Sequence, residues 1–234
     1  MDTDHSLLNS WAGAHLALFV EGQSRLSTLV GSDSPSWELN TATGLLTLNG
    51  VHLHCALLGT VEDGSDTWVW SWADENLDPT SVAVARTESL PLFGEESGLW
   101  EFTESTFSLD GVVDLGMTPG ATLTLVASPQ IMGGAIFCGV SPGRRSYIVI
   151  TDPRLTMEAP SPYTALKHIQ GAAAYGLADV RDIVTVYASF HQLDMEDTPT
   201  GVKLMFEDGE GLDITIDETG RIDHMEPIVA PPGV

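Results

Sequence analysis

Basic side chains are scarce in this sequence. Nine lysine and arginine residues stand against thirty-three aspartate and glutamate residues, which gives a formal net charge of −24. Nucleic acids and anionic membranes bind proteins through clustered lysine and arginine, and the only adjacent basic pair here is Arg144-Arg145. The composition therefore argues against nucleic acid and membrane partners. Two interpretations of the acidity stay open: it keeps the protein soluble and unassociated, or it forms a surface that meets a basic protein partner or mimics nucleic acid.

Cysteine is also rare, and the two residues are Cys55 and Cys138. Both lie in apolar stretches, which indicates buried thiols in a reducing compartment rather than a disulfide framework. No apolar run approaches the ~20 residues that a membrane helix needs. The chain starts with Asp2 and Asp4, where a signal peptide carries positive charge. We therefore expect a cytoplasmic protein that does not enter a membrane.

Tryptophan is concentrated in one stretch, where Trp68, Trp70 and Trp72 account for half of the six residues of this type. In an extended strand this spacing places all three indoles on one face. Each removes roughly 150–250 Å² from water when buried, so the fold is expected to condense on this strand. The indoles form either the core or one wall of an apolar pocket. Trp72 is the better ligand-facing residue, because Asp74 and Asn76 supply polar groups beside it. The candidate ligand- or partner-binding residues are Trp68, Trp70, Trp72, Asp74 and Asn76.

Hydrophobic periodicity predicts an α+β protein built on antiparallel β-meanders, with helices packed on one face. The predicted helices cover residues 6–30, 78–90, 162–175 and 179–191, with a further one starting at Thr118-Pro119. Residues 122–125 alternate in the manner of a strand, so both helix and strand remain possible for the segment that starts at Thr118-Pro119. The predicted strands cover residues 36–40, 45–49, 51–61, 67–73, 134–141, 146–152, 202–207, 212–217 and 221–226. Residues 95–120 are expected to be irregular.

Short connections favour a single domain over residues 1–227. A proline-spaced loop at residues 153–162 is the place for a division, if one exists. Residues 228–234, which include Pro231-Pro232, are expected to form a flexible tail.

Two groups of residues resemble metal ligands. His52 and His54 share one face of a strand, but zinc needs three or four ligands at one point and no third ligand is near in sequence. The second group consists of His191, Asp194, Glu196 and Asp197, with His224 as a more distant member. These residues suit either a divalent cation or the solvated end of an acidic helix. We predict no metal site and no cofactor.

No catalytic motif is recognisable. The sequence contains no Gly-x-Ser-x-Gly elbow, no Gly-x-x-x-x-Gly-Lys-Ser/Thr loop and no Gly-x-Gly-x-x-Gly fingerprint after a strand. Neither cysteine has an evident histidine partner other than His54, the neighbour of Cys55. Among thirty-three acidic residues, chance alone supplies carboxylate pairs. No catalytic residue is therefore predicted.

The tryptophan stretch resembles an uncharacterised bacterial family with a Trp-x-Trp-x-Trp-Ala-Asn signature. The similarity extends over residues 37–40, 44–48, 58–60 and 68–74, and the C-terminal stretches 206–209 and 216–222 are also similar. Asp74 stands where the signature has Asn, so a hydrogen bond donated by an amide at this position is in question. The resemblance implies membership of a family of unknown function, with no catalytic residues to carry over.

The leading functional hypothesis is a non-enzymatic cytoplasmic binding protein of an immunity, chaperone or adaptor type, whose acidic surface meets a basic protein. The alternative is an enzyme or small-ligand binder that uses the tryptophan pocket. Its acid–base groups would be Asp74, His191 or His224.

Overall fold

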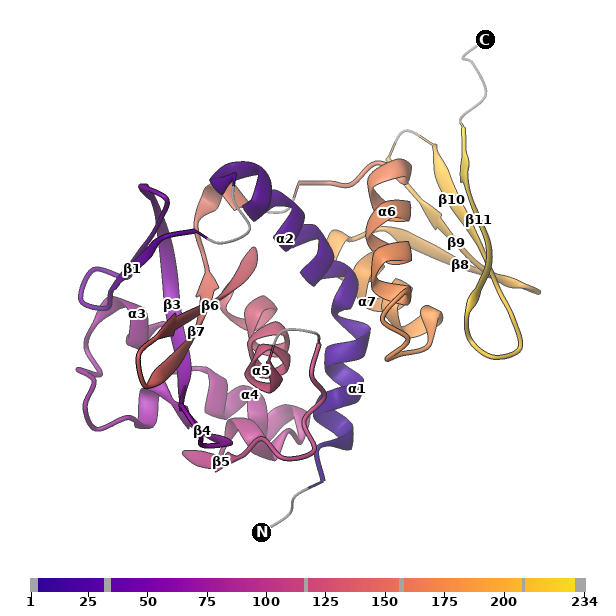
Figure 1. Cartoon of the computed structure of the whole chain (residues 1–234). Coiled ribbons are helices and arrows are strands. Elements are labelled where there is room, and N and C mark those ends of the chain that lie inside the picture. Colours follow the sequence, from indigo (N-terminus) through magenta and orange to yellow (C-terminus); the bar gives the residue numbers. More distant parts are fainter. Residues whose placement is uncertain (1–3, 32–34, 116–117, 156–157, 208, 230–234) are drawn as a thin grey trace. The chain divides into compact units, whose positions relative to one another are not determined.

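The computed structural model describes residues 4–31, 35–115, 118–155, 158–207 and 209–229 (Figure 1). Contacts divide the chain into two compact units. Unit 1 comprises Met1–Asn9 and Gly22–Thr156, and unit 2 comprises Ser10–Glu21 and Met157–Val234. The single domain expected over 1–227 stays a prediction, and the two units are described separately below. The boundary after Thr156 falls inside the 153–162 interval named above as the alternative division.

The mixed α+β class with antiparallel strands is confirmed. The elements of the first 155 residues are α1 (Ser6–Ala14), α2 (Leu16–Val30), β1 (Trp37–Asn40), β2 (Leu45–Leu48), β3 (Val51–Glu62), β4 (Thr67–Trp70), η1 (Ser71–Ala73), α3 (Val82–Ala85), α4 (Leu90–Ser97), η2 (Trp100–Phe102), β5 (Thr106–Ser108), α5 (Pro119–Ala127), η3 (Ser128–Ile131), β6 (Ala135–Ser141), β7 (Arg144–Ile150) and η4 (Pro153–Leu155). The elements that follow are α6 (Pro162–Ala173), α7 (Val180–His191), β8 (Asp194–Thr198), β9 (Gly201–Met205), β10 (Gly211–Ile216) and β11 (Ile222–Ile228).

In the described part of unit 1, seven strands form one antiparallel sheet with β3 at its centre. The long β3 pairs with β2, β4 and β7, and β6 pairs with β7 (Figure 1). The predicted hairpin before β3 is confirmed, because Gly44 adopts φ +64° at the turn between β1 and β2. The open choice at residue 118 is settled as the helix α5.

The tryptophan strand is shorter than predicted. β4 ends at Trp70, and Ser71–Ala73 form a 3₁₀ turn instead of continuing the strand. The buried Ser71 hydroxyl donates a hydrogen bond to the carbonyl of Leu57 on β3, which turns the chain inward there. Trp68 and Trp70 do share one face, with ring centroids 5.1 Å apart in an edge-to-face arrangement.

Three further boundaries differ from the prediction. The helix expected over 6–30 consists of α1 and α2, because the N–H of His15 divides its hydrogen bond between the carbonyls of Trp11 and Ala12. The helix expected over 78–90 is reduced to α3, and α4 begins where it was expected to end. Pro91 stands in the first turn of α4, where a missing N–H costs little. Residues 95–120, expected to be irregular, contain the short strand β5.

Unit 2 contains a four-stranded antiparallel sheet in the order β11-β10-β9-β8, counted over the described residues (Figure 1). Two helices cover one face, with α6 against β10 and β11, and α7 against β8 and β9. The side chains beneath the helices are fully buried: Val202, Leu204, Leu212 and Ile214. Both helices begin within one residue of the predicted start. A capping box of Ser161 with Thr164 precedes α6, and Asp179 is the N-cap of α7.

The acidic residues after α7 form the strand β8 and not the solvated end of a helix, which was one of the two expectations. Aspartate and glutamate have low strand propensity, but here the backbone of residues 194–198 completes the ladder along β9. Strand β11 extends to Ile228, so the predicted tail begins later than expected, and residues 230–234 lie outside the described chain. No helix in the described residues is long and apolar enough to cross a membrane.

The two buried indoles give a matched test of the core of unit 1. Both Trp68 and Trp70 are 0% exposed, but only Trp70 has a partner: its Nε1 donates to the carbonyl of Glu101 at 2.8 Å. Within the described residues, Trp68 Nε1 has no hydrogen-bond partner. We expect Trp70→Phe to lower the free energy of unfolding by about 1–3 kcal/mol more than Trp68→Phe, because it orphans a buried carbonyl. Urea unfolding followed by far-UV circular dichroism measures both, and equal losses would contradict the proposed role of this hydrogen bond.

Candidate functional site

The predicted aromatic site lies in unit 1, and its residues differ in accessibility. Trp68 and Trp70 are fully buried core residues, so an open pocket has no access to them. Trp72 is half-buried and stacks on Trp70 with centroids 6.5 Å apart. Its Nε1 is buried, with no hydrogen-bond partner among the described residues. Trp72 is therefore the most accessible of the three indoles, and its role in binding stays a prediction.

Asp74 and Asn76 build the turn that follows the 3₁₀ segment. The Asp74 carboxylate accepts hydrogen bonds from the backbone N–H and the side-chain amide of Asn76, at 2.9 and 3.0 Å. It also accepts one from Arg144 at 2.7 Å. Burial raises the pKa of Asp74, but the bonds from Asn76 and Arg144 outweigh it and lower the pKa below its usual value. The carboxylate is thus occupied by the turn and by Arg144, and a binding role for these residues stays a prediction.

The candidate metal ligands are not brought together. His52 contacts the Thr47 hydroxyl at 2.9 Å. His191 ends α7 and is followed by the three acidic residues of β8, whereas His224 lies on β11 at the opposite edge of the sheet. Over the residues that the structure describes, no group of three or more histidine, cysteine, aspartate or glutamate side chains could hold a metal ion.

A buried carboxylate in unit 2 is the main polar feature that the sequence patterns did not predict. Glu21 of α2 is 0% exposed. Its Oε2 lies 2.9 Å from Nε2 of His191 on α7 and 3.5 Å from Nδ1 of His168 on α6. The same His168 nitrogen lies 3.2 Å from the hydroxyl of Tyr187. One carboxylate therefore joins three helices of unit 2.

Burial and pairing act on Glu21 in opposite directions. Burial raises the pKa of its carboxyl, since the charged form loses its water. Hydrogen bonds and positive charge from His168 and His191 outweigh this and hold the pKa far below its ordinary value. A signal for this cluster exists in the sequence. Glu21 follows the buried Ala17 and Leu18 by four and three residues, and so lies on the apolar stripe of its helix.

A second buried carboxylate–histidine pair lies in unit 1. His5 Nδ1 is 3.0 Å from Glu101 Oε1, and the two residues are 3% and 1% exposed. The His5 ring stacks on Trp100 with centroids 5.2 Å apart. In the described residues, the second oxygen of Glu101 has no hydrogen-bond partner. Both carboxylate–histidine pairs are enclosed by protein, so neither presents an acid–base group to a substrate.

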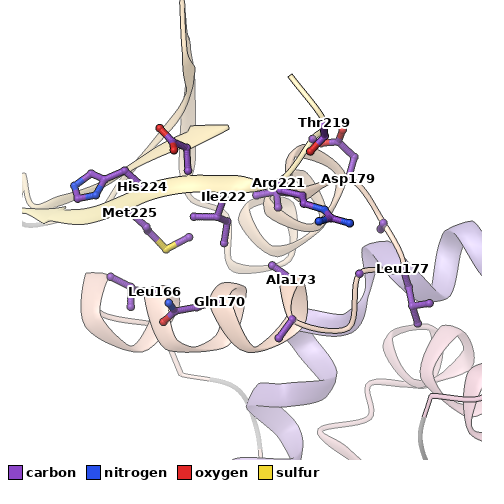
Figure 2. Close-up of a pocket in the computed structure, with 16 residues that line it drawn as sticks. Leu166, Gln170, Ala173, Leu177, Asp179, Thr219, Arg221, Ile222, His224 and Met225 are labelled. Carbon is purple, nitrogen blue, oxygen red and sulfur yellow. The ribbon is translucent and has the colours of Figure 1, made fainter. Parts of the chain in front are cut away.

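An open groove of about 1040 Å³ lies in unit 2 between α6 and β11 (Figure 2). Leu166, Gln170 and Ala173 line it from one face of α6, and Ile222 and Met225 line it from β11 (Figure 2). The remaining lining residues come from the end of α6, the segment that leads into α7, and β11 with the turn before it: Ala174, Gly176, Leu177, Ala178, Asp179, Val180, Thr219, Gly220, Arg221, Asp223 and His224. Its lining combines apolar side chains, such as Leu166, Ile222 and Met225, with polar ones, such as Gln170, Asp179 and Arg221.

The face of the unit 2 sheet opposite the helices is polar and mainly acidic. The strand register places Glu196, Lys203, Asp213 and Glu226 in one row across all four strands. Lys203 Nζ lies 3.4 Å from Asp213, while Glu196 and Glu226 are exposed at the two ends of the row. Asp194 and His224 belong to the neighbouring rows of the same face. We call this surface, formed by Asp194, Glu196, Lys203, Asp213, His224 and Glu226, the acidic sheet face.

Comparison with known proteins gives one match. The model of a family of unknown function, DUF6882, matches residues 9–153. No curated protein matches the chain. No solved structure matches it either.

The Glu21 cluster predicts a defined response to acid. A carboxyl whose pKa is lowered on folding stabilises the folded state above its unfolded pKa of about 4.5, and this contribution is lost as the pH falls through the folded value. We expect Glu21→Gln to lower the free energy of unfolding by about 3–5 kcal/mol near neutral pH, because His191 and His168 lose the buried carboxylate oxygen that they contact.

The difference in the free energy of unfolding between Glu21→Gln and the unsubstituted protein should become smaller as the pH falls below about 4.5. Chemical unfolding at several pH values measures this difference. The matched control in the same unit is Glu218→Gln, at an exposed position, and it should change the free energy of unfolding little. A cost for Glu21→Gln that stays constant down to about pH 3 would contradict the assignment.

Proposed function

The chain belongs to the DUF6882 family of unknown function, and we propose that it is a non-enzymatic binding module for a basic protein partner. The observation that carries the proposal is the acidic sheet face. Four carboxylates there face a single lysine, and the side chains of Glu196 and Glu226 are exposed. This surface lies outside residues 9–153, so the proposal concerns this chain and not every member of the family.

Surface charge of this kind favours a partner of opposite sign. An acidic patch steers a basic partner toward itself and raises the association rate at low ionic strength. The net charge of −24 strengthens the attraction at long range. It also selects against nucleic acids and anionic membranes as partners, since both repel it.

A binding role is preferred to an enzymatic one because of where the acid–base groups lie. The two carboxylate–histidine pairs, Glu21 with His191 and His5 with Glu101, are enclosed by protein. Catalysis by general acid or base requires a group within hydrogen-bond reach of the substrate. In these pairs, buried polar groups instead serve as hydrogen-bond partners for one another.

The proposed class is an immunity, chaperone or adaptor protein of a bacterial cytoplasm. Both cysteines are unpaired, and burial raises the pKa of the Cys55 thiol to about 12. Such a thiol is protonated and unreactive at neutral pH, which suits a structural residue in a reducing compartment.

The proposal predicts capture of basic proteins that depends on the acidic sheet face and on salt. With the full chain as bait, we expect basic proteins to bind at about 50 mM salt and to be released at about 500 mM, since screening shortens the reach of the charges. A variant that neutralises Asp194, Glu196, Asp213 and Glu226 as amides should capture at least about tenfold less, a loss of roughly 1.4 kcal/mol.

The control neutralises an equal number of exposed acidic residues in unit 1: Glu38, Asp66, Glu95 and Asp110. It changes the net charge equally and should retain most of the capture. Quantitative mass spectrometry of the captured proteins reports their identity and charge. Capture that is indifferent to salt, or that both variants reduce equally, would count against the acidic sheet face.

A further inference from the structure

The outer edge of β11 is a free sheet edge. Within the described chain, β11 pairs with β10 on one side and with no strand on the other. An edge strand of this kind presents a row of unpaired N–H and C=O groups, which another extended segment can pair with. The opposite edge of the sheet is β8, and on its helix side it has a side-chain contact from a helix. There Arg181 of α7 is ion-paired with Asp197 of β8 and also donates a hydrogen bond to the Gly201 carbonyl.

The groove lies beside this free edge, on the side of the sheet that the helices cover. Its wall on α6 carries Leu166, Gln170 and Ala173, and Met225 of β11 projects toward it (Figure 2). Short side chains such as Ala173 and Ala174 leave the space open. A strand added to β11 lies about 4.8 Å from it, so every second side chain of that strand would point into the groove.

The other side chains of an added strand would continue the rows of the acidic sheet face. The row of Glu196, Lys203, Asp213 and Glu226 ends at the β11 edge with Glu226. Glu226 is 66% exposed, and its nearest basic group is the His224 ring at 3.4 Å. A residue placed opposite Glu226 is therefore favoured when it is lysine or arginine.

We propose that β11 and the adjoining groove bind an extended segment of the partner by strand addition, with basic side chains over the acidic sheet face and apolar side chains in the groove. The backbone pairing supplies affinity, and the alternation of side chains supplies specificity. This inference rests on the proposed function and names the recognition element within it. The segment it describes places a lysine or arginine between two apolar residues.

The test uses a fluorescent, amidated peptide of alternating valine and lysine, about nine residues long, titrated with the full chain. Fluorescence anisotropy measures its Kd. We expect Glu226→Lys to raise the Kd at least about tenfold, and Glu196→Lys, at the far end of the same row, to change it less than about twofold. The two variants carry the same charge change on the same sheet face, at different distances from the β11 edge.

A second pair of measurements addresses the groove and the backbone. Ala173→Phe, at a half-buried position, fills the groove and should raise the Kd at least about tenfold. A peptide with a central proline loses a backbone donor and should bind correspondingly more weakly. Thermal unfolding of each variant checks that the fold is kept.

The outcomes separate this inference from the proposed function. If Glu226→Lys and Glu196→Lys weaken binding equally and Ala173→Phe has no effect, the peptide lies across the acidic sheet face. Strand addition is then overturned, while a basic partner is still supported. If the peptide does not bind but basic proteins are captured in a salt-dependent manner, strand addition is again overturned. If neither the peptide nor any basic protein binds, both proposals fail.

Discussion

The burial of the Glu21 carboxylate is the constraint on which unit 2 depends. A charge without access to water must be paired, and the pairing here comes from His168 on α6 and His191 on α7. The rotation of α6 about its axis is thereby set. At about 100° per residue, Leu166, Gln170 and Ala173 lie roughly 140–200° from His168. The interaction that holds the helices together thus also turns these three side chains away from Glu21, toward the groove.

The sheet of unit 2 follows the same division between covered and open surfaces. Alternation along β9 and β10 buries Val202, Leu204, Leu212 and Ile214 beneath the helices. The intervening positions must then face away from the helices, and they carry the charged row that contains Lys203 and Asp213. Charge on one face of the sheet opposes edge-to-edge aggregation, and the same charge is what a basic partner would meet. Solubility and recognition are therefore compatible explanations of one surface.

Sequence patterns predicted the parts of this structure that depend on local rules. Period-two alternation located β9 and β10, and the helix predicted over 179–191 matches α7, whose N-cap is Asp179. Pairing across long sequence separation was not predictable, because Glu21 and His191 are 170 residues apart and Glu21 is one of thirty-three acidic residues. Strand β8 was missed because tertiary pairing with β9 overrides the poor strand propensity of its acidic residues. The tryptophan stretch was predicted to form either core or pocket wall, and the turn at Ser71 depends on a hydrogen bond to Leu57 that no spacing reveals.

The most direct test of the account is hydrogen–deuterium exchange of the full chain with and without a bound basic peptide. Slowed exchange reports which backbone amides become protected in the complex. The account predicts protection of the β11 amides, with little change in β8 and none in residues 68–76 of unit 1. Protection centred on residues 68–76 would place the binding surface at the tryptophan stretch and would contradict the assignment to unit 2.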